Sequence, residues 1–379
     1  MIVETFGVGI VGYGFMGKVH TYGYRNIPLF YDPPPCETKL LGVCTAHKDT
    51  AEKAMRIGEF ESCTTDYREL LEREDIHIIN CCTPNRHHKE LLLAAIDAGK
   101  HIYCDKPLAF DAEEAREIAD AAAKGKGKYQ VTLQYRFLPA TLRAKQLIEE
   151  GFLGRVFGFR AAYLHAGYID PNRPMSWRLK KGESGGGALF DLGSHILDLI
   201  YHLLGDYASV FAACETMIKE RPLKDDPSKK DTVEVDDVAI LTVRMKDGAV
   251  GTVEAWRLAT GTNDELKFEI HGEKGALRFN LMDPNWLYAF DTREAEGDYG
   301  GNRGFKQIEC VQRYPKPAVL PAPKASVGWI RAHMACLHDF LTHIAEDTPT
   351  CPSFADGARI HEVMDAAYRS SDTGERVEC

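Results

Sequence analysis

The sequence predicts an α/β fold with two domains: one built on a parallel sheet, and an α+β domain with a mostly antiparallel, open sheet. Three observations lead to this prediction. Over about the first 130 residues, short apolar runs alternate with helical patterns, as in βαβ units. A glycine-rich turn follows the first apolar run. After about residue 150 the runs become longer and alternate with polar residues.

The elements of the first domain follow one another in a regular order. The residue patterns predict strands at 6–12, 40–46, 76–84, 101–107 and 129–137, and helices at 16–27, 49–58, 86–99 and 111–125. Asp111 and Glu114 have the spacing of a capping box at the start of the last helix. The proline-rich segment 27–39 is predicted to be a loop.

The second domain is predicted to follow a boundary between residues 132 and 133, so that the domains are 1–132 and 133–379. A strand is expected at 155–167, and hairpins at 236–259 and 265–280. The charged segment 220–237 is expected to be an exposed connection. Two helices, at 329–346 and 354–371, are predicted near the end of the chain.

Composition and charge exclude several classes of partner. The chain of 379 residues is 44% hydrophobic and carries a formal net charge of −10, which argues against nucleic acid and anionic membranes. Its start lacks the features of a signal peptide, and no apolar run is long enough for a membrane span. The eleven cysteines include no C-x-x-C pair, so neither a disulfide framework nor a metal site is expected. We expect a cytoplasmic protein.

The glycine-rich turn predicts a dinucleotide site. Gly12, Gly14 and Gly17 have the G-x-G-x-x-G spacing between a strand and a helix, and the intervening Phe15 and Met16 belong to the same expected site. The spacing allows a tight turn, close approach of a pyrophosphate, and close packing of helix on strand. A purely structural turn is the alternative.

The end of the second strand bears on the choice of cofactor. Thr45 and Ala46 stand where an acidic residue usually binds the adenosine ribose. His47 and Lys48 could attract a 2′-phosphate, but no arginine is present to clamp it. NAD is slightly favoured, and NADP stays open.

The segment 185–205, GGGALFDLGSHILDLIYHLLG, places two polar residues on an apolar helix. Asp191 and His195 are four residues apart and would share one helix face. Such a pair is a buried hydrogen bond, half of a metal site or part of a catalytic apparatus. Zinc needs three or four ligands, and no companion motif supplies them.

Four motifs in order resemble one family. The glycine loop, CTPNRHH (82–88), YCDKPLA (103–109) and GGGALFDLGSHILD (185–198) are together similar to the glucose–fructose oxidoreductase, inositol dehydrogenase and rhizopine-catabolism (Gfo/Idh/MocA) family. The similarity covers nearly the whole chain. It implies a Rossmann domain followed by a substrate-binding and oligomerisation domain.

The resemblance assigns roles to the motif residues. The family's Glu-Lys-Pro is here Asp105-Lys106-Pro107, and its D-x-x-x-H pair falls on Asp191 and His195. His195 would be the base that takes the hydroxyl proton, and Lys106 would stabilise the reacting oxygen. Asp191 would bind substrate hydroxyls or adjust the basicity of His195.

Further contacts follow from the same resemblance. Besides the glycine loop, the expected cofactor residues are Thr45, Thr83, Pro84, Asn85, His88, Asp105 and Lys106. The expected substrate residues, with the three catalytic ones, are Tyr135, Arg136, Tyr163, His165, Trp177 and Arg178.

We therefore expect an NAD(P)-dependent oxidoreductase that acts on a secondary hydroxyl of a sugar, glycoside or polyol. The insertion at 27–39 and the segment DPNRPMSWR (170–178) resemble, in general sequence character, segments of the family branches that often oxidise pyranosides at C3. An inositol 2-dehydrogenase, an enzyme that recycles a tightly bound cofactor between two sugars, and a non-catalytic sugar sensor are the alternatives. A metal-dependent hydrolase or lyase is a further one. An open sheet needs covering, so a homodimer or homotetramer is expected.

Overall fold

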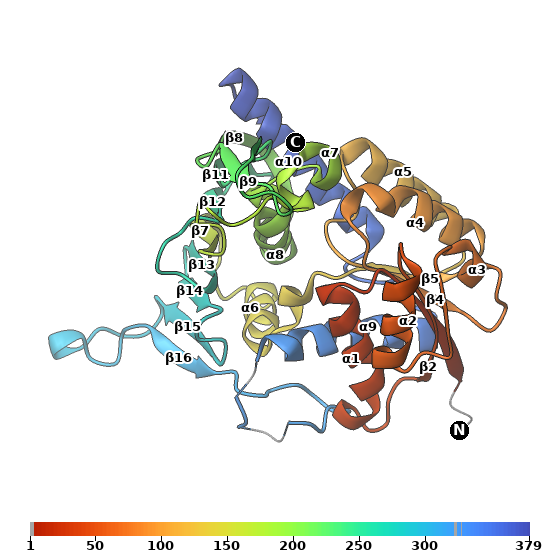
Figure 1. Cartoon of the computed structure of the whole chain (residues 1–379). Helices are drawn as coiled ribbons and strands as arrows, with labels where there is room; N and C mark the ends of the chain where they lie inside the picture. The colour runs from red at the N-terminus through yellow and green to blue at the C-terminus, as the bar shows by residue number, and fades with distance from the viewer. Residues whose placement is uncertain (1–3, 322–323, 327) are drawn as a thin grey trace. The chain divides into compact units, whose positions relative to one another are not determined.

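The chain forms two compact units, each built on its own sheet (Figure 1). The computed structural model describes residues 4–321, 324–326 and 328–379. Unit 1 consists of Met1–Phe137, Tyr314–Ala322 and Gly328–His361, and unit 2 of Leu138–Arg313, Pro323–Val327 and Glu362–Cys379. The predicted contiguous division after residue 132 differs from this arrangement, because a late helix returns to the first unit.

Unit 1 is a Rossmann domain. Within the described residues its sheet has six strands in the order β3-β2-β1-β4-β5-β6, and all pairs are parallel. Its elements are β1 (Thr5–Val11), α1 (Phe15–Phe30), β2 (Glu37–Cys44), α2 (Lys48–Gly58), β3 (Ser62–Thr64), α3 (Arg68–Leu71), β4 (Ile78–Cys81), η1 (Asn85–His87), α4 (His88–Asp97), β5 (His101–Cys104), α5 (Ala112–Lys124), β6 (Tyr129–Val131), η2 (Gln134–Phe137) and α9 (Trp329–Ala345).

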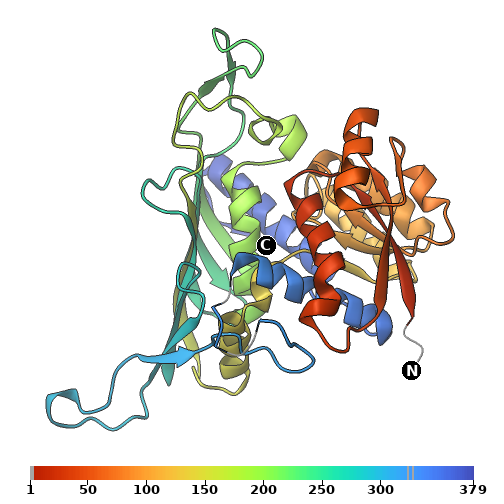
Figure 2. The ribbon, with the colours of Figure 1, turned by 60° about the horizontal axis from the view of Figure 1, so that its bottom comes forward.

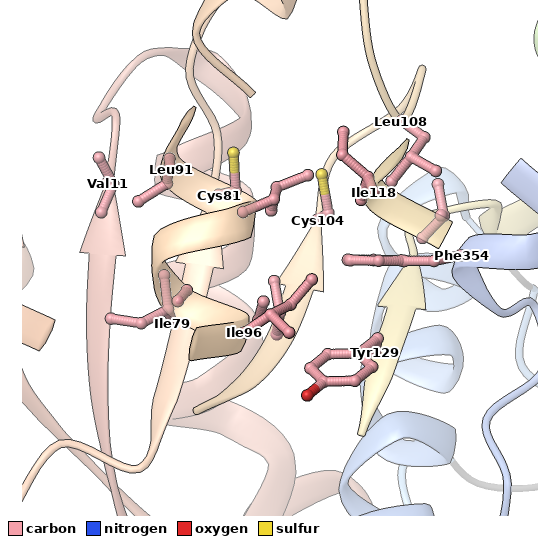
Figure 3. Close-up of a cluster of buried hydrophobic side chains, with 14 of the residues drawn as sticks. Val11, Ile79, Cys81, Leu91, Ile96, Cys104, Leu108, Ile118, Tyr129 and Phe354 are labelled. Carbon is pink, nitrogen blue, oxygen red and sulfur yellow. The ribbon is translucent and has the colours of Figure 1, made fainter. Parts of the chain in front are cut away.

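The alternation of apolar residues along the strands builds a core on each face of this sheet. On one face β1 side chains pack with α1 and α9, and Met334, Leu337 and Phe340 are among the buried α9 residues. On the other face, strand residues such as Ile79 pack with α4, α5 and Phe354 (Figure 3). Burying the apolar face of α9 in this core explains why it belongs to unit 1.

The strand order reverses between β1 and β4, where a doubly wound sheet binds its ligand at the carboxyl ends of the strands. The glycine loop, Thr83 and Lys106 follow β1, β4 and β5 respectively, so the topology brings these three predicted features to one edge.

Two local details of unit 1 differ from or refine the predictions. Helix α1 continues through Pro28 to Phe30, because Ile27 and Phe30 are buried in the core, and the predicted loop shortens accordingly. Asp111 caps α5 as predicted, and its side chain accepts from Glu114 N–H at 2.8 Å.

Unit 2 has a larger, mostly antiparallel sheet. In the described part of the chain it has nine strands in the order β16-β15-β14-β13-β7-β12-β11-β8-β17, and β7 and β12 are its parallel pair. Its elements are α6 (Pro139–Glu149), β7 (Val156–His165), η3 (Trp177–Leu179), α7 (Lys181–Ser184), η4 (Leu189–Gly193), α8 (Ser194–Leu204), β8 (Tyr207–Glu215), β9 (Glu220–Pro222), β10 (Lys230–Thr232), β11 (Val238–Met245), β12 (Val250–Trp256), β13 (Asp264–Gly272), β14 (Gly275–Asn280), β15 (Trp286–Asp291), η5 (Asp298–Gly300), β16 (Lys306–Glu309) and β17 (Val377–Glu378), and α10 (Phe354–Thr373) spans both units.

Both predicted hairpins form, as β11–β12 and β13–β14. The segment 220–237, predicted to be an exposed connection, contains the two-stranded ribbon β9–β10, and its Arg221, Asp236 and Asp237 are buried. Helices α6 and α8 lie on one side of the large sheet (Figure 2). On the outward-facing positions of the other side, Phe211, Ile240 and Val250 are exposed.

Among the residues that the structure describes, no helix has both the length and the apolar character that a membrane span requires.

Candidate functional site

The glycine loop of unit 1 has the shape that a dinucleotide phosphate needs. Gly12 has φ +90°, and a Cβ there would lie 2.4 Å from the Cys82 carbonyl oxygen. A Cβ on Gly17 would lie 2.3 Å from the Gly12 carbonyl oxygen, so strand and helix approach closely. Gly14, at the N-cap of α1, faces open space, since a Cβ there would meet no described atom within 4 Å. Helix N–H groups and open space together fit a pyrophosphate.

Filling that space tests the fit. We expect Gly14→Val to raise the Kd for NAD about tenfold or more, because the added side chain occupies the position of the phosphates. The melting temperature should change little, since the side chain meets no described neighbour. Isothermal calorimetry and thermal unfolding measure the two effects.

Gly304→Val is the matched control, because Gly304 also faces open space but lies in unit 2. Unchanged NAD affinity in Gly14→Val would contradict a phosphate site at this loop.

The end of β2 is polar but has no carboxylate. The Thr45 hydroxyl lies 2.6 Å from the Thr50 hydroxyl and donates to the His47 carbonyl at 3.0 Å. Lys48 is exposed and has Glu52 3.9 Å away. Beside the loop, Phe15 is exposed and its ring lies 5.8 Å from that of Trp329.

The loops after β4 and β5 carry the other predicted cofactor residues. Asn85 is buried at the start of η1, and the Asp105 carboxylate accepts from the Lys106 N–H at 2.9 Å. His88 is fully buried, and its two ring nitrogens lie 2.9 Å from the Thr83 carbonyl oxygen and 3.1 Å from that of Leu108. His88 therefore contacts the backbone of both loops, and the cofactor-binding role predicted for it stays a prediction.

Two further buried histidines lie in unit 1 and were missed in the sequence. His20 Nδ1 lies 3.2 Å from Asn80 Oδ1 and 3.3 Å from Cys82 Sγ. Burial lowers the pKa of His20, against the opposing charge of Asp105. Burial also lowers the pKa of His333 well below its ordinary value, and the charges of His20 and Lys106 add to this. His333 comes from α9, so no local sequence signal could have placed it here.

The predicted substrate residues of η2 lie within unit 1 and are buried. The Trp329 indole N–H donates to the Tyr135 hydroxyl at 3.2 Å, and an Arg136 N–H donates to Cys351 Sγ at 3.3 Å.

In unit 2, an aspartate outside the predicted motif shapes the start of the Asp191 segment. The Asp236 carboxylate accepts from Gly187 N–H at 2.9 Å and Leu189 N–H at 2.8 Å, and the Tyr368 hydroxyl also donates to it. A Cβ on Gly187 would lie 2.0 Å from the Asp236 carbonyl oxygen, so this close approach requires glycine. Asp191 itself lies in η4, a turn of π-helix that leads into α8, rather than in the α-helix predicted for it. Such turns are frequent at functional sites.

Arg257 is a partner of Asp191 that sequence reasoning missed. Its guanidinium is buried, lies 3.4 Å from the Asp191 carboxylate and sits 5.0 Å from the ring centre of Tyr168. Burial alone would lower the pKa of Arg257, but Asp191, Tyr168, Asp236 and Tyr368 together raise it above its ordinary value. A buried cation of this kind holds the carboxylate in its ionised form.

His195 lies next to Tyr163, which was predicted to contact the substrate. Its ring lies 5.8 Å from that of Tyr163 in an edge-on arrangement, and the Tyr163 hydroxyl donates to Asp264 at 2.5 Å. His165 Nδ1 instead accepts from Gly167 N–H at 3.1 Å, and the Arg178 guanidinium lies 4.5 Å from the centre of the Trp177 ring. Unit 2 thus brings together Tyr163 with His195, and Asp191 with Arg257.

A parallel sheet of this strand order with an open glycine loop defines a dinucleotide-binding domain. Comparison with family models agrees. Residues 6–133 match the oxidoreductase family, NAD-binding Rossmann fold, and residues 141–278 match the GFO/IDH/MocA C-terminal domain. The chain belongs to the Gfo/Idh/MocA family of NAD-binding oxidoreductases.

Similar proteins narrow the class to sugar dehydrogenases. The chain is 37% identical over 382 residues to levoglucosan dehydrogenase of Pseudarthrobacter phenanthrenivorans, with 97% of each chain covered. A solved structure of levoglucosan dehydrogenase in complex with NADH and levoglucosan matches with a TM-score of 0.94, 37% identity and 99% of each chain covered. Inositol 2-dehydrogenase of Rhizobium meliloti is 28% identical over 367 residues, which cover 97% of each chain.

Proposed function

We propose that this NAD-dependent sugar dehydrogenase oxidises a secondary hydroxyl of a glycoside or anhydro sugar. The observation that carries the proposal is the polar set around the start of α8, where Asp191 is ion-paired with Arg257 and His195 meets Tyr163. An ionised carboxylate and an imidazole suit a ligand rich in hydroxyl groups. The 37% identity to levoglucosan dehydrogenase, against 28% to inositol 2-dehydrogenase, favours a glycoside-like substrate over an inositol.

The proposed mechanism gives each residue one task. His195 accepts the proton of the reacting hydroxyl, and the Lys106 ammonium donates a hydrogen bond to the same oxygen as negative charge develops on it. Asp191, held ionised by Arg257, accepts a hydrogen bond from a neighbouring sugar hydroxyl and orients the ring. NAD, when bound, would supply the acceptor for the hydride that leaves the carbon being oxidised.

The glycine loop, Thr45 and the segments Thr83–Asn85 and Asp105–Lys106 would hold the cofactor. We propose NAD as the preferred form. The only cation next to Thr45 within the described turn, Lys48, has an acidic neighbour in Glu52, and no arginine stands there to clamp a 2′-phosphate.

The absorbance of the reduced cofactor at 340 nm tests the choice of substrate and of cofactor in one assay. The protein is given NAD or NADP with levoglucosan, an alkyl glucoside, glucose or myo-inositol. We expect turnover with NAD and a glycoside-like sugar, and a kcat/KM for that sugar about tenfold or more above that for myo-inositol.

Faster turnover of myo-inositol would replace the proposal by an inositol dehydrogenase. If no sugar is turned over, nicotinamide released on denaturation would indicate a cofactor recycled between two sugars. An empty protein without turnover would contradict the proposal.

We also propose that the face of the large sheet opposite α6 and α8 is the interface between copies of the chain in an oligomer. Phe211, Ile240 and Val250 are exposed on neighbouring strands of this face, which would leave apolar surface in water. Light scattering should show a dimer or tetramer, and Ile240→Glu should shift it towards the monomer. Ile57→Glu, at an exposed position of α2, is the control. A monomeric wild-type protein would contradict this proposal.

A further inference from the structure

Two cysteines and a histidine form a buried cluster at the ends of β4 and β5, next to the loops that are predicted to bind the cofactor. Cys81 and Cys104 are the last residues of β4 and β5 and pair directly in the sheet, and their sulfur atoms point the same way (Figure 3). His88 begins α4. All three side chains are fully buried, and the two sulfurs and a ring nitrogen lie within 4.8 Å of one another.

The hydrogen bonds of His88 determine its protonation state. Nε2 lies 2.9 Å from the Thr83 carbonyl oxygen, and Nδ1 lies 3.1 Å from the Leu108 carbonyl oxygen. A carbonyl oxygen only accepts, so both nitrogens must carry a proton to make these bonds. Only an imidazolium cation makes both bonds at once, because in a neutral ring an unprotonated Nδ1 would instead accept from the Cys104 thiol, 3.7 Å away. While both bonds are made, neither nitrogen has a lone pair for a metal ion.

A buried cation needs an anionic partner, and the contacts of the two cysteines distinguish them. Cys104 has one S–H proton, and both of its acceptors, the Asp105 carbonyl oxygen 3.1 Å from Sγ and the Cys81 sulfur, require that Cys104 keeps it. Cys81 Sγ lies 3.5 Å from the Thr83 hydroxyl, which is able to donate to a thiolate. These contacts favour Cys81 over Cys104 as the anionic partner of His88.

The pKa directions agree with this pairing. Burial alone would raise the pKa of Cys81, but the hydrogen bond from Cys104 and the charge of His88 lower it well below its ordinary value. Burial alone would lower the pKa of His88, but Cys81 and the two carbonyl contacts raise it to about 9. Burial raises the pKa of Cys104, with contributions from Cys81, Asp105 and Cys82.

The peptide group between Leu108 and Ala109 contacts two histidines: its carbonyl oxygen lies next to His88, and its N–H contacts His361. The Ala109 N–H donates to His361 Nε2 at 3.1 Å, so this nitrogen carries no proton. Burial lowers the pKa of His361 to about 3, and the charge of His88 adds to this. The Leu108–Ala109 peptide group, two residues beyond Lys106, is thus bonded at its carbonyl by a charged histidine and at its N–H by a neutral one.

We propose that the Cys81 thiolate and the His88 imidazolium form a positioning ion pair, which fixes the loop after β4 to the segment that carries Lys106. The charge on His88 is what lets one side chain donate to both carbonyls at once. A neutral ring would leave a lone pair facing a carbonyl oxygen, and one of the two loops would be released. The kinetic consequence rests on the role proposed above for Lys106, whereas the ion pair itself does not.

The protonation of His88 is measurable directly in the intact protein. We expect nitrogen NMR of imidazole-labelled protein, with His88 assigned through His88→Gln, to show two protonated nitrogens at about pH 7 and loss of a proton near pH 9. Cys81→Ser removes the thiolate at nearly constant volume, and should move this titration below about pH 7. Cys104→Ser, which keeps a donor for Asp105, is the matched control and should leave the titration near pH 9.

Kinetics then test the positioning role. Cys81→Ser should lower kcat about tenfold to a hundredfold with little change in the KM for the sugar, because misplacement of Lys106 affects the chemical step. A neutral His88 in the wild-type protein at pH 7 would overturn the proposal, as would an equal response of the two serine variants. Stoichiometric metal that is lost in Cys81→Ser would also overturn it. If Cys81→Ser does not fold, the wild-type titration decides.

The two proposals fail separately. A wild-type protein that turns over no sugar but shows two protonated His88 nitrogens would refute the proposed reaction and keep the ion pair. The converse result would refute the ion pair alone.

Discussion

Replacing Lys106 by alanine is expected to lower kcat with the best sugar about 10²–10³-fold, the loss typical of removing one donor to a developing oxyanion. Lys106 comes two residues after β5, at the carboxyl edge of the unit 1 sheet. A doubly wound sheet of this strand order binds its dinucleotide at that edge. Lys106 is also among the residues proposed to hold NAD, but it is not proposed to bind the phosphates, so the Kd for NAD should rise by less than about threefold. Steady-state kinetics and calorimetry separate the two effects.

Two variants serve as references for Lys106→Ala. Lys126→Ala removes a lysine from an exposed position of the same unit and should leave kcat unchanged. Lys106→Arg keeps the charge but not the shape of the ammonium group, so it should recover only a part of the lost rate. If Lys106→Ala retains a wild-type kcat, Lys106 has no part in the chemical step.

His195→Asn is expected to lower kcat about 10²–10⁴-fold, which is the range for loss of a general base. The side chain lies on α8 against the Tyr163 ring, and asparagine is able to hydrogen-bond there but cannot take up the proton. Sugar oxidation requires the neutral imidazole, so wild-type activity should fall as the pH decreases and His195 becomes protonated. In His195→Asn the residual activity should lose this acidic limb.

The pH profile distinguishes a catalytic from a merely structural histidine. His271→Asn changes a half-exposed histidine of β13 and should preserve both kcat and the profile. A His195→Asn variant that is slow but keeps the wild-type acidic limb would show that another group accepts the proton.

The fold of both units was largely predictable, because the signals that define it are local. A strand, a glycine turn and a helix within residues 5–30 carry the dinucleotide motif, and the hairpins at β11–β12 and β13–β14 follow from alternation and turn residues. Where local signals failed, packing was the reason. Pro28 did not end α1 because the core needs Ile27 and Phe30.

The sequence by itself determined the order of the elements, the glycine loop and the positions of Lys106, Asp191 and His195, since each depends on residues near it in the chain. Only the tertiary structure decided the pairing of Asp191 with Arg257 and the return of α9 to unit 1. It also brought two carbonyl oxygens and a sulfur from other segments to the His88 ring, and the charge proposed for His88 depends on these groups. Protonation inside a protein is fixed by desolvation and by the groups that face the ring, and packing alone brings those groups together.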